Sequence, residues 1–450
     1  MGKLFGTDGI RGIANKDLTA ELAFKTGQSG AYVLTKHTAG HRPRILIGKD
    51  TRKSGDMLEA ALTAGLCSMG AKVIPLGVVP TPAVAYLTRY YKADAGVVIS
   101  ASHNPCEYNG IKFFNQDGYK LSDAIENEIE SYITGEKKIE NLPTHGGVGY
   151  VSANHNAVED YVAFAVSTID CRLDGMTIAI DCANGASYET AFKALNKLGA
   201  NVEAIHNTPD GVNINYKCGS THMESLKAYV TSIGADIGLA FDGDADRLLA
   251  VDENGNLIDG DQIMAACAKF MREQGKLKQN TLVATVMSNL GLFIAGEKLG
   301  LNIPRTKVGD RYVLEEILAN GYNIGGEQSG HIIFLDHNTT GDGLVSALQF
   351  LSVLKKTGMK ASEAAGIVTI MPQVLRNAKV KLENKNTYME NPEIAAACKA
   401  LEDEFAGEGR VLIRPSGTEP LVRVMIEGKD VDYITKKAEE LADMIEKILG

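Results

Sequence analysis

A strand–loop unit recurs along the first 370 residues and restricts the folds open to this chain. The segment at 70–73 (Gly-Ala-Lys-Val), followed by an apolar run at 93–99, has a counterpart at 199–202 (Gly-Ala-Asn-Val), followed by a run at 235–241. In each copy a helix ends at glycine, a strand follows, and a second strand ends in a polar loop. A weaker third copy begins at Gly300. The repetition predicts related α/β domains.

The segments between these landmarks support an α/β organisation. Strands are expected at 44–48, 72–76 and 95–100, helices at 57–69 and 83–91, and a hairpin turn at 254–256 before a helix that begins near Gly260. Such alternation predicts mixed sheets covered by helices. After Met371 the pattern changes to a strand, a helix at 392–405, strands at 410–413 and 421–427, and a final helix at 431–449. That last helix carries an apolar stripe formed by Ile434, Ala438, Leu441, Ile445 and Ile448.

These patterns divide the chain into four predicted domains. A Gly- and Pro-containing stretch at 135–149 is interpreted as the first linker. The expected domains are an α/β domain at 1–152, a second at 153–255, a third at 256–370, and a smaller α+β domain at 371–450.

Composition narrows the class of protein. The 450 residues are 44% apolar and 23% charged, as in ordinary globular proteins, and the net charge of −10 argues against nucleic-acid binding. The odd number of scattered cysteines, which show no C-x-x-C spacing, indicates a reducing compartment. We find neither a targeting segment nor an apolar run near the ~18 residues of a membrane span. A cytoplasmic location is therefore predicted, with neither membrane nor nucleic acid as a partner.

The apolar run at 97–100 ends abruptly in a polar turn that presents Ser102 beside His103, with Lys112 ten residues further on. A buried strand followed by a turn is how a protein displays a nucleophile at the edge of a sheet. The alternative is an ordinary loop closed by Pro105.

The loop after the run at 235–241 carries Asp242, Asp244 and Asp246. Three carboxylates at this spacing repel one another unless a cation lies among them, and hard oxygen ligands suit Mg²⁺ or Ca²⁺. An EF-hand would place Glu253 at its twelfth position, but Arg247 stands where glycine is required and a strand precedes the loop. A haloacid-dehalogenase-like nucleophile at Asp242, or simply solvated acids, are further alternatives. A catalytic Mg²⁺ site is favoured.

Three weaker motifs also carry chemistry. The glycine-rich segment 325–331 contains Glu327 and Ser329, which suit vicinal sugar hydroxyls, although a plain glycine-rich hairpin fits equally. The segment 414–420 and Arg423 combine arginines, hydroxyls and glycine as in a phosphate cradle, or as in a capped turn between strands. The loop 6–12 places Arg11 among glycines and is uninformative alone.

Taken in this order, the five loops resemble those of the α-D-phosphohexomutase family over essentially the whole chain. Ser-Ala-Ser-His-Asn-Pro at 100–105 and Gly-Glu-Gln-Ser-Gly-His at 326–331 are most similar to the branch acting on glucosamine phosphates. The resemblance implies three related α/β domains and a C-terminal α+β domain of TATA-binding-protein-like fold around a central cleft.

The resemblance also implies roles for individual residues. Ser102 matches the serine that bears the catalytic phosphate and, with Asp242, Asp244 and Asp246, ligates Mg²⁺. Glu327 and Ser329 match residues that contact sugar hydroxyls, and His331 matches a proton-transfer residue. The residues that lie in reaction-centre motifs are Arg11, His103, Lys112 and Arg247. The residues that match the loop holding the phosphate that is not reacting are Arg414, Ser416, Gly417, Thr418 and Arg423. Ala245 departs from the family's usual Asp-Gly-Asp-Gly-Asp-Arg, which costs about 1 kcal/mol if that position needs a positive φ.

The resemblance implies an isomerase that interconverts glucosamine 6-phosphate and glucosamine 1-phosphate through a phosphoserine enzyme and a 1,6-bisphosphate. The metabolism implied is that of amino sugars and peptidoglycan precursors. One Mg²⁺ per chain, a sugar 1,6-bisphosphate primer and a phosphorylated amino-sugar substrate follow from the resemblance, with homodimerisation left open. Phosphoglucomutase or phosphomannomutase activity is the alternative; a haloacid-dehalogenase-like phosphatase or a Ca²⁺-binding module is a distant one. Lys112 and His331 are both candidates for the general base.

Overall fold

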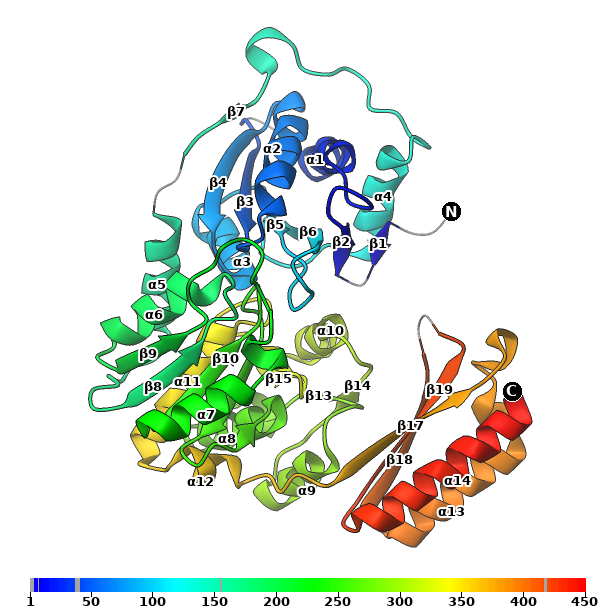
Figure 1. Ribbon diagram of the computed structural model, residues 1–450. Helices are drawn as coiled ribbons and strands as arrows, with labels where there is room; N and C mark the ends of the chain where they lie inside the picture. Colours follow the sequence, from blue (N-terminus) through cyan, green and yellow to red (C-terminus); the bar gives the residue numbers. More distant parts are fainter. Residues whose placement is uncertain (1–3, 7, 37–40, 154–155, 417–418) are drawn as a thin grey trace. The chain divides into compact units, whose positions relative to one another are not determined.

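The computed structural model describes residues 4–6, 8–36, 41–153, 156–416 and 419–450 (Figure 1). These residues form two compact units. The first unit runs to Met287 and resumes from Leu301 to Ile367, and the second comprises Ser288–Gly300 and Val368–Gly450.

The first sheet is built around parallel strands that are covered on both faces. Its order is β1-β2-β6-β5-β3-β4-β7, with β3, β4, β5 and β7 parallel and β6, β2 and β1 joined antiparallel. The strands are β1 (Phe5–Gly6), β2 (Gly9–Ile13), β3 (Arg44–Lys49), β4 (Lys72–Val78), β5 (Ala95–Ile99), β6 (Tyr108–Asn115) and β7 (Tyr150–Val151). All five residues of β5 are buried, as expected of a strand between two helical layers.

Helices pack on both faces of this sheet. The apolar faces of α1 (Ala20–Thr35), α2 (Ser54–Ser68) and α4 (Asp123–Ile133) share one core with Ile45, Ile47, Val97 and Ile99. On the opposite face α3 (Thr81–Tyr90) approaches so closely that a Cβ at Gly96 would lie 2.9 Å from Val84. The helices and strands predicted between 44 and 100 are confirmed, with ends shifted by one to three residues.

The second sheet repeats the arrangement of the first. Its order is β12-β11-β10-β8-β9, in which β10, β8 and β9 are parallel and β11 is antiparallel. The elements are α5 (Ala157–Ser167), β8 (Thr177–Asp181), α6 (Ser187–Lys197), β9 (Asn201–Ile205), α7 (Glu224–Ile233), β10 (Ile237–Phe241), β11 (Leu248–Asp252) and β12 (Leu257–Ile258). The predicted turn at 254–256 joins β11 to β12.

A third, smaller copy follows. Here β13 pairs parallel with β14, a parallel bridge joins Val283, just before β13, to Gly325 of β15, and β16 is antiparallel to β15. The elements are α8 (Gly260–Glu273), β13 (Ala284–Thr285), β14 (Arg305–Thr306), α10 (Asp310–Asn320), β15 (Ile324–Gly326), β16 (Ile332–Phe334), α11 (Gly343–Thr357) and α12 (Ala361–Ala365). Asp259 and Gln262 form a capping box that starts α8 near the predicted Gly260.

The three copies share one strand order: β6-β5-β3-β4, β11-β10-β8-β9 and β16-β15-β13-β14. The prediction of related α/β domains, including the weak third copy, is therefore confirmed. The connection after the third parallel strand carries Ser102 in the first copy, Asp242–Asp246 in the second and Glu327 in the third. The chemistry-bearing loops thus occupy the same place in each repeat.

The second unit is the smaller α+β domain predicted after Met371. Its sheet has the order β17-β19-β18, formed by β17 (Gln373–Lys379), β18 (Gly409–Pro415) and β19 (Leu421–Gly428), with α13 (Pro392–Phe405) and α14 (Val431–Leu449) packed beside it (Figure 1). Ile434, Ala438, Leu441 and Ile445 are buried as predicted, whereas Ile448 is half-buried and Leu449 is buried instead. The helix α9 (Leu290–Leu299) joins this unit through Leu290 N, which donates to Glu427 Oε1 at 3.2 Å.

One-turn 3₁₀ helices lie at His145–Gly147, Gly219–Thr221, Lys278–Asn280, Leu382–Asn384 and Tyr388–Glu390. The first lies in the predicted linker between α4 and β7, and the four domain boundaries stay predictions. Within the described residues, no helix has the length and apolarity needed to span a membrane. The seven cysteines are all described and all are free thiols.

Candidate active site

Ser102 lies in the turn that follows β5 and is only 2% exposed. Its Oγ donates to Asp242 Oδ2 at 2.6 Å, so the displayed hydroxyl of the first repeat touches the acidic loop of the second. The backbone of Ser102 is left-handed, with φ at +52°, which a non-glycine residue adopts only when its surroundings hold it there.

Side chains that the sequence analysis missed hold this turn. Arg52 Nη2 donates to Ser102 O at 3.1 Å and to Asn104 O at 2.5 Å. Asn215, from the second repeat, donates to the same two carbonyls at 2.8 and 3.0 Å. Asp50 Oδ2 accepts from Ser100 Oγ at 2.6 Å and also pairs with Arg52. The usable signal was Asp50-Thr51-Arg52 directly after a buried strand, at the sheet edge where Ser102 lies.

Asp242, Asp244 and Asp246 are buried, and each offers an oxygen that lies within 4.8 Å of the others. Asp244 Oδ1 and Asp246 Oδ1 have no hydrogen-bond partner among the described residues. Burial and the neighbouring charges of Asp246 and Asp244 raise the pKa of Asp242 well above its usual value. Two buried oxygens lack partners, and the three carboxylates repel one another; a bound divalent cation would satisfy both. Carboxylate oxygens are ligands that suit Mg²⁺.

The acidic loop contains a glycine that its close packing requires. A Cβ at Gly243 would lie 2.5 Å from Ser102 O and 2.8 Å from Asn215 Nδ2. Ala245 adopts φ +57°, so the position does require the left-handed region. That conformation costs alanine about 1–2 kcal/mol. Burial of the methyl group returns about 0.8 kcal/mol, and glycine would cost about 0.5–1 kcal/mol of chain entropy. The contributions nearly cancel, which explains why alanine is tolerated there.

These contacts predict opposite outcomes for two substitutions in one loop. Gly243→Ala should lower kcat by about 100-fold, because the new methyl group displaces the Ser102 turn. Ala245→Gly should leave kcat within twofold and change the free energy of unfolding by less than about 1 kcal/mol. Steady-state kinetics and urea denaturation measure both. Normal activity of Gly243→Ala would contradict the tight packing.

A second group, Asp181, His206 and Cys218, also brings metal-type ligands together. Its central carboxylate is already engaged: Asp181 accepts from Ala183 N at 2.9 Å, from Gly219 N at 3.0 Å and contacts His206 Nδ1 at 2.9 Å. This group therefore holds loops of the second repeat together. The acidic loop differs, because two of its buried carboxylate oxygens have no hydrogen-bond partner among the described residues.

The predicted cations approach the acidic loop from the first repeat. Lys112 is buried on β6, with its Nζ 3.0 Å from Asp244 Oδ2 and 3.2 Å from Asp8 Oδ2. Burial alone would lower the pKa of Lys112, but the carboxylates of Asp244 and Asp8 outweigh it and raise the pKa. Arg11 forms an ion pair with the same Asp8. The two carboxylates therefore favour the protonated form of Lys112.

His331 joins the second and third repeats. Its Nδ1 lies 3.4 Å from Asp246 Oδ2, its Nε2 lies 3.5 Å from Asp310 Oδ2, and Gly341 N donates to Nε2 at 3.1 Å. Burial opposes protonation, but Asp246 and Asp310 raise the pKa of His331 to about 9. The Gly341 bond acts against them, because it uses the Nε2 lone pair. His331 can take up a proton at Nε2 only by breaking that bond.

His103 and Arg247 complete the predicted reaction-centre residues. His103 Nδ1 lies 3.4 Å from Ser102 Oγ, and burial with the charges of Arg247 and Arg11 lowers the pKa of His103, which favours the neutral ring. Arg247 Nε lies 3.9 Å from Asp246 Oδ1, and the backbone of Arg247 pairs with that of His331 in an isolated antiparallel β-bridge. Burial opposes the charge on Arg247, but Asp242 and Asp246 raise its pKa.

A cavity of about 610 Å³ opens beside these groups, and Arg11, Asp246, Arg247, Glu327 and His331 line it. Glu327 Oε1 accepts from Gly309 N at 2.9 Å, while Ser329 is exposed in the turn between β15 and β16. The cavity has room for a phosphorylated sugar and presents both cations and hydroxyl-binding groups.

The predicted phosphate loop belongs to the second unit. Arg414 on β18 and Arg423 on β19 are directly opposite in the register. Burial and the charge of Arg423 lower the pKa of Arg414, and Arg423 Nε is buried without a hydrogen-bond partner among the described residues. Ser416 accepts from Glu419 N at 3.2 Å, and Gly417 and Thr418 lie outside the described residues. Like charges facing each other across a strand pair are stabilised by an anion.

The EF-hand alternative is excluded by the structure. The strand β10 precedes the acidic loop, and the Glu253 carboxylate accepts from Ser362 N at 3.1 Å rather than turning back to the aspartates.

Comparisons with known proteins agree with this geometry. Family models match in order: Phosphoglucomutase/phosphomannomutase, alpha/beta/alpha domain I at residues 2–140, domain II at 158–255, domain III at 259–370 and the C-terminal domain at 378–445. A phosphoglucosamine mutase of Ruminiclostridium cellulolyticum is 64% identical over 99% of both chains. Another, of Acetivibrio thermocellus, is 63% identical over the full length of both.

Solved structures show the same fold. The chain is similar to a putative phosphomannomutase of Thermus thermophilus, with a TM-score of 0.78, 23% identity and 98% of each chain covered. It is also similar to the N-acetylphosphoglucosamine mutase of Aspergillus fumigatus in complex with GlcNAc-6P and magnesium, with a TM-score of 0.69, 18% identity, and 99% and 96% of the two chains covered. The order of the loops, the four matched domains and the full-length relatives agree: this chain belongs to the phosphoglucomutase/phosphomannomutase family of phosphohexomutases.

Proposed function

We propose that this chain interconverts glucosamine 6-phosphate and glucosamine 1-phosphate through a phosphorylated Ser102. The observation that carries the proposal is the contact between Ser102 Oγ and the buried aspartate loop, at 2.6 Å from Asp242 Oδ2. The substrate class is supported by relatives above 60% identity that carry the name phosphoglucosamine mutase over their full length.

Asp242, Asp244 and Asp246 would hold Mg²⁺, and their unpartnered buried oxygens fit that ion. When bound, the metal supplies positive charge that neutralises a phosphoryl group on Ser102 Oγ. Two of these carboxylates are also fixed by neutral donors of the chain: Thr81 Oγ1 donates to Asp244 Oδ2 at 2.7 Å, and Arg247 N donates to Asp242 Oδ1 at 3.3 Å. The loop is thus preorganised for a cation.

In the proposed first step the O1 hydroxyl of glucosamine 6-phosphate attacks the phosphorus on Ser102. The bond between phosphorus and Oγ breaks, the bond to O1 forms, and the hydroxyl proton leaves O1 while Oγ regains a proton. The resulting 1,6-bisphosphate then returns its 6-phosphoryl group to Ser102 and leaves glucosamine 1-phosphate. Each transfer depends on positioning and charge stabilisation, because phosphate monoesters are unreactive.

The residues of the chain supply that stabilisation. The neighbouring carboxylates of Asp244 and Asp8 favour the protonated form of Lys112, so we assign it to charge stabilisation rather than to proton abstraction. Arg11 and Arg247 add positive charge at the same cavity. This leaves His331 as the proton-transfer candidate, at the cost of its hydrogen bond from Gly341. Glu327 and Ser329 are assigned to the sugar hydroxyls.

Arg414, Ser416 and Arg423 are assigned to the phosphate that is not reacting. Arg423→Gln should raise KM for glucosamine 6-phosphate by about 10- to 100-fold, because a charge-assisted contact to phosphate contributes about 1.5–3 kcal/mol. It should change kcat much less. Steady-state kinetics separates the two constants, and Lys429→Gln, in an exposed ion pair with Glu408 of the same unit, serves as the control. An unchanged KM would contradict the assignment.

The substrate assignment is tested by initial rates on three sugar 6-phosphates in parallel, with Mg²⁺ and a trace of sugar 1,6-bisphosphate. We expect kcat/KM for glucosamine 6-phosphate to exceed those for glucose 6-phosphate and mannose 6-phosphate. Faster conversion of glucose or mannose phosphate would retain the mechanism and overturn the substrate. Release of inorganic phosphate without any 1-phosphate would indicate a phosphatase.

The remaining assignments are part of the same proposal. The bisphosphate primer is supported by a related Aspergillus fumigatus structure described in complex with glucose 1,6-bisphosphate. The phosphorylated amino sugar is the proposed partner. Cytoplasmic location, homodimerisation and the absence of nucleic-acid partners stay predictions from the sequence.

A further inference from the structure

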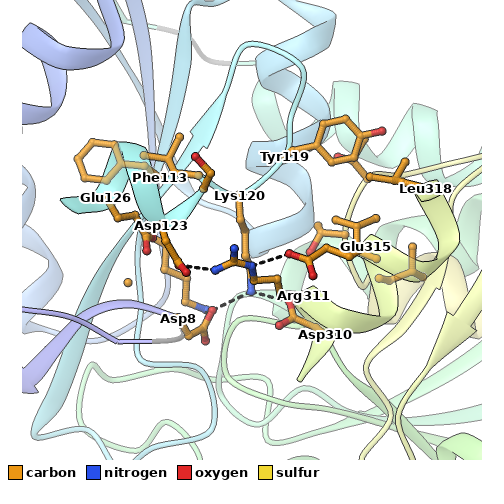
Figure 2. A pocket seen from close by; sticks show the side chains of 18 of the residues that line it. Asp8, Phe113, Tyr119, Lys120, Asp123, Glu126, Asp310, Arg311, Glu315 and Leu318 are labelled. Atoms are coloured by element: carbon orange, nitrogen blue, oxygen red, sulfur yellow. Dashed lines mark hydrogen bonds and ion pairs between the residues drawn. The ribbon is translucent and has the colours of Figure 1, made fainter. Parts of the chain in front are cut away.

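Lys120 joins the first and third repeats in the lining of the candidate substrate cavity. It follows β6, whose turn at Gly118 brings Lys120 back to pair with Phe114. Its Nζ donates to Asp8 Oδ1 at 2.8 Å and to Asp310 Oδ2 at 2.6 Å (Figure 2). Asp8 precedes β2 in the first repeat, and Asp310 is the first residue of α10 in the third. One ammonium group thus connects two carboxylates from distant parts of the chain.

Both carboxylates also contact groups assigned to the reaction. Asp8 pairs with Arg11, and its Oδ2 lies 3.2 Å from Lys112 Nζ. Asp310 Oδ2 lies 3.5 Å from His331 Nε2. The residue before Asp310 is Gly309, whose N–H donates to Glu327 Oε1 at 2.9 Å. The bridge therefore lies in the wall of the substrate cavity, and each of its two carboxylates also contacts groups assigned to the reaction.

The Lys120 ammonium group is shared by both carboxylates of this bridge and is largely buried. The side chain is only 21% exposed, and the two carboxylates it joins are 26% and 20% exposed. The opposed charges hold the ammonium ion in place despite burial, since Asp310 and Asp8 raise the pKa of Lys120 well above its usual value. Without the Lys120 charge, Asp310 and Asp8 would repel each other. Asp8 would then attract Lys112 and Arg11 more strongly, and Asp310 would attract His331 more strongly.

We propose that Lys120 is a positioning residue for phosphoryl transfer. Its ammonium group neutralises part of the negative charge of both Asp8 and Asp310. Lys112 and Arg11 on one side of the cavity, and His331 and Glu327 on the other, therefore keep a fixed spacing. This inference rests on the proposed function, because the spacing matters for a substrate held between the two repeats. Displacement of reacting groups by about 1 Å costs about 100-fold in rate.

A second lysine that joins two repeats provides a matched control. Lys356, in α11 of the third repeat, pairs with Asp170, in the segment between α5 and β8 of the second repeat. Its side chain is 30% exposed, and neither Lys356 nor Asp170 is among the described residues that line the substrate cavity. If ion pairs between repeats had a purely structural role, the two bridges would be equivalent.

The experiment compares Lys120→Met, Lys120→Gln, Lys120→Arg and Lys356→Gln with wild type, using mutase kinetics on glucosamine 6-phosphate and thermal melting. We expect Lys120→Met and Lys120→Gln to lose about 100-fold in kcat, with a much smaller change in KM. Lys120→Arg, which retains the charge, should recover at least tenfold of that loss. Lys356→Gln should stay within twofold of wild type.

Inactivity of the wild-type protein would refute the proposed function, whereas the ratio of variant to wild-type rates tests Lys120 alone. Should Lys120→Met fail to fold, the comparison of Lys120→Gln with Lys120→Arg decides. The inference is overturned if the neutral variants keep more than a third of the wild-type kcat, if arginine restores nothing, or if Lys356→Gln loses as much as they do.

Discussion

Ser102→Ala is expected to abolish net conversion of glucosamine 6-phosphate, with a loss of at least about 10⁴-fold in kcat, as when a covalent nucleophile is removed. Without Oγ there is no atom to carry the phosphoryl group between the two positions of the sugar. Substrate binding should persist, because the cations that line the cavity and Glu327 are untouched. Intact-mass measurement should show phosphate on the wild-type protein and none on the variant.

The matched control is Ser100→Ala in the same turn. Ser100 Oγ accepts from Ser102 N at 2.9 Å and donates to Asp50, so its removal loosens the turn without removing the nucleophile. We expect a loss of about 10- to 30-fold, because two hydrogen bonds of about 1 kcal/mol each are removed. Near-normal turnover by Ser102→Ala would refute the phosphoserine scheme, and equal losses in both variants would mean that only the shape of the turn matters.

The second large effect concerns the acidic loop. Removal of Mg²⁺ by a chelator should abolish turnover, and Asp244→Asn should lower it by at least about 10³-fold, as expected when charge stabilisation of the transferring group is lost. A readout independent of activity is thermal melting. Ligand linkage predicts that Mg²⁺ at about 100 times its dissociation constant stabilises the wild-type protein by about 2.7 kcal/mol.

In Asp244→Asn that Mg²⁺-dependent stabilisation should largely disappear. Asp252→Asn is a suitable control, because this buried carboxylate of β11 accepts from Asn254 N and Asn256 N and holds the hairpin turn. Its variant should melt earlier but still respond to Mg²⁺. An equal Mg²⁺ response in wild type and Asp244→Asn would contradict the metal assignment.

Much of the fold could be predicted because the strands and helices of each repeat have recognisable local patterns of apolar residues. The runs at 95–99 and 237–241 are apolar at every position, which is typical of central parallel strands between helical layers. The weak third copy shares the strand order of the other two although its strands, such as β13, are only two or three residues long. Strands this short leave little periodicity to detect, so the topology there follows from kinship of the repeats rather than from pattern.

The site could be predicted only where residues follow one another in a loop. Ser102 and the three aspartates stand at strand ends, so their chemistry is visible in sequence. Arg52 lies 50 residues from Ser102 and meets it at the edge of the first sheet, whereas Asn215 lies 113 residues away and meets it only through the packing of two repeats. Lys120 lies 190 residues from Asp310. Contacts of this kind depend on the relative placement of sheets, which no local pattern records.

The central claim is that the phosphoryl group on Ser102 passes to the sugar. The most direct measurement is a single-turnover experiment in which protein labelled with radioactive phosphate at Ser102 is mixed with glucosamine 6-phosphate and Mg²⁺. The account predicts that label leaves the protein and appears in glucosamine 1,6-bisphosphate and glucosamine 1-phosphate. Label that stays on the protein, or that leaves only as inorganic phosphate, would contradict it.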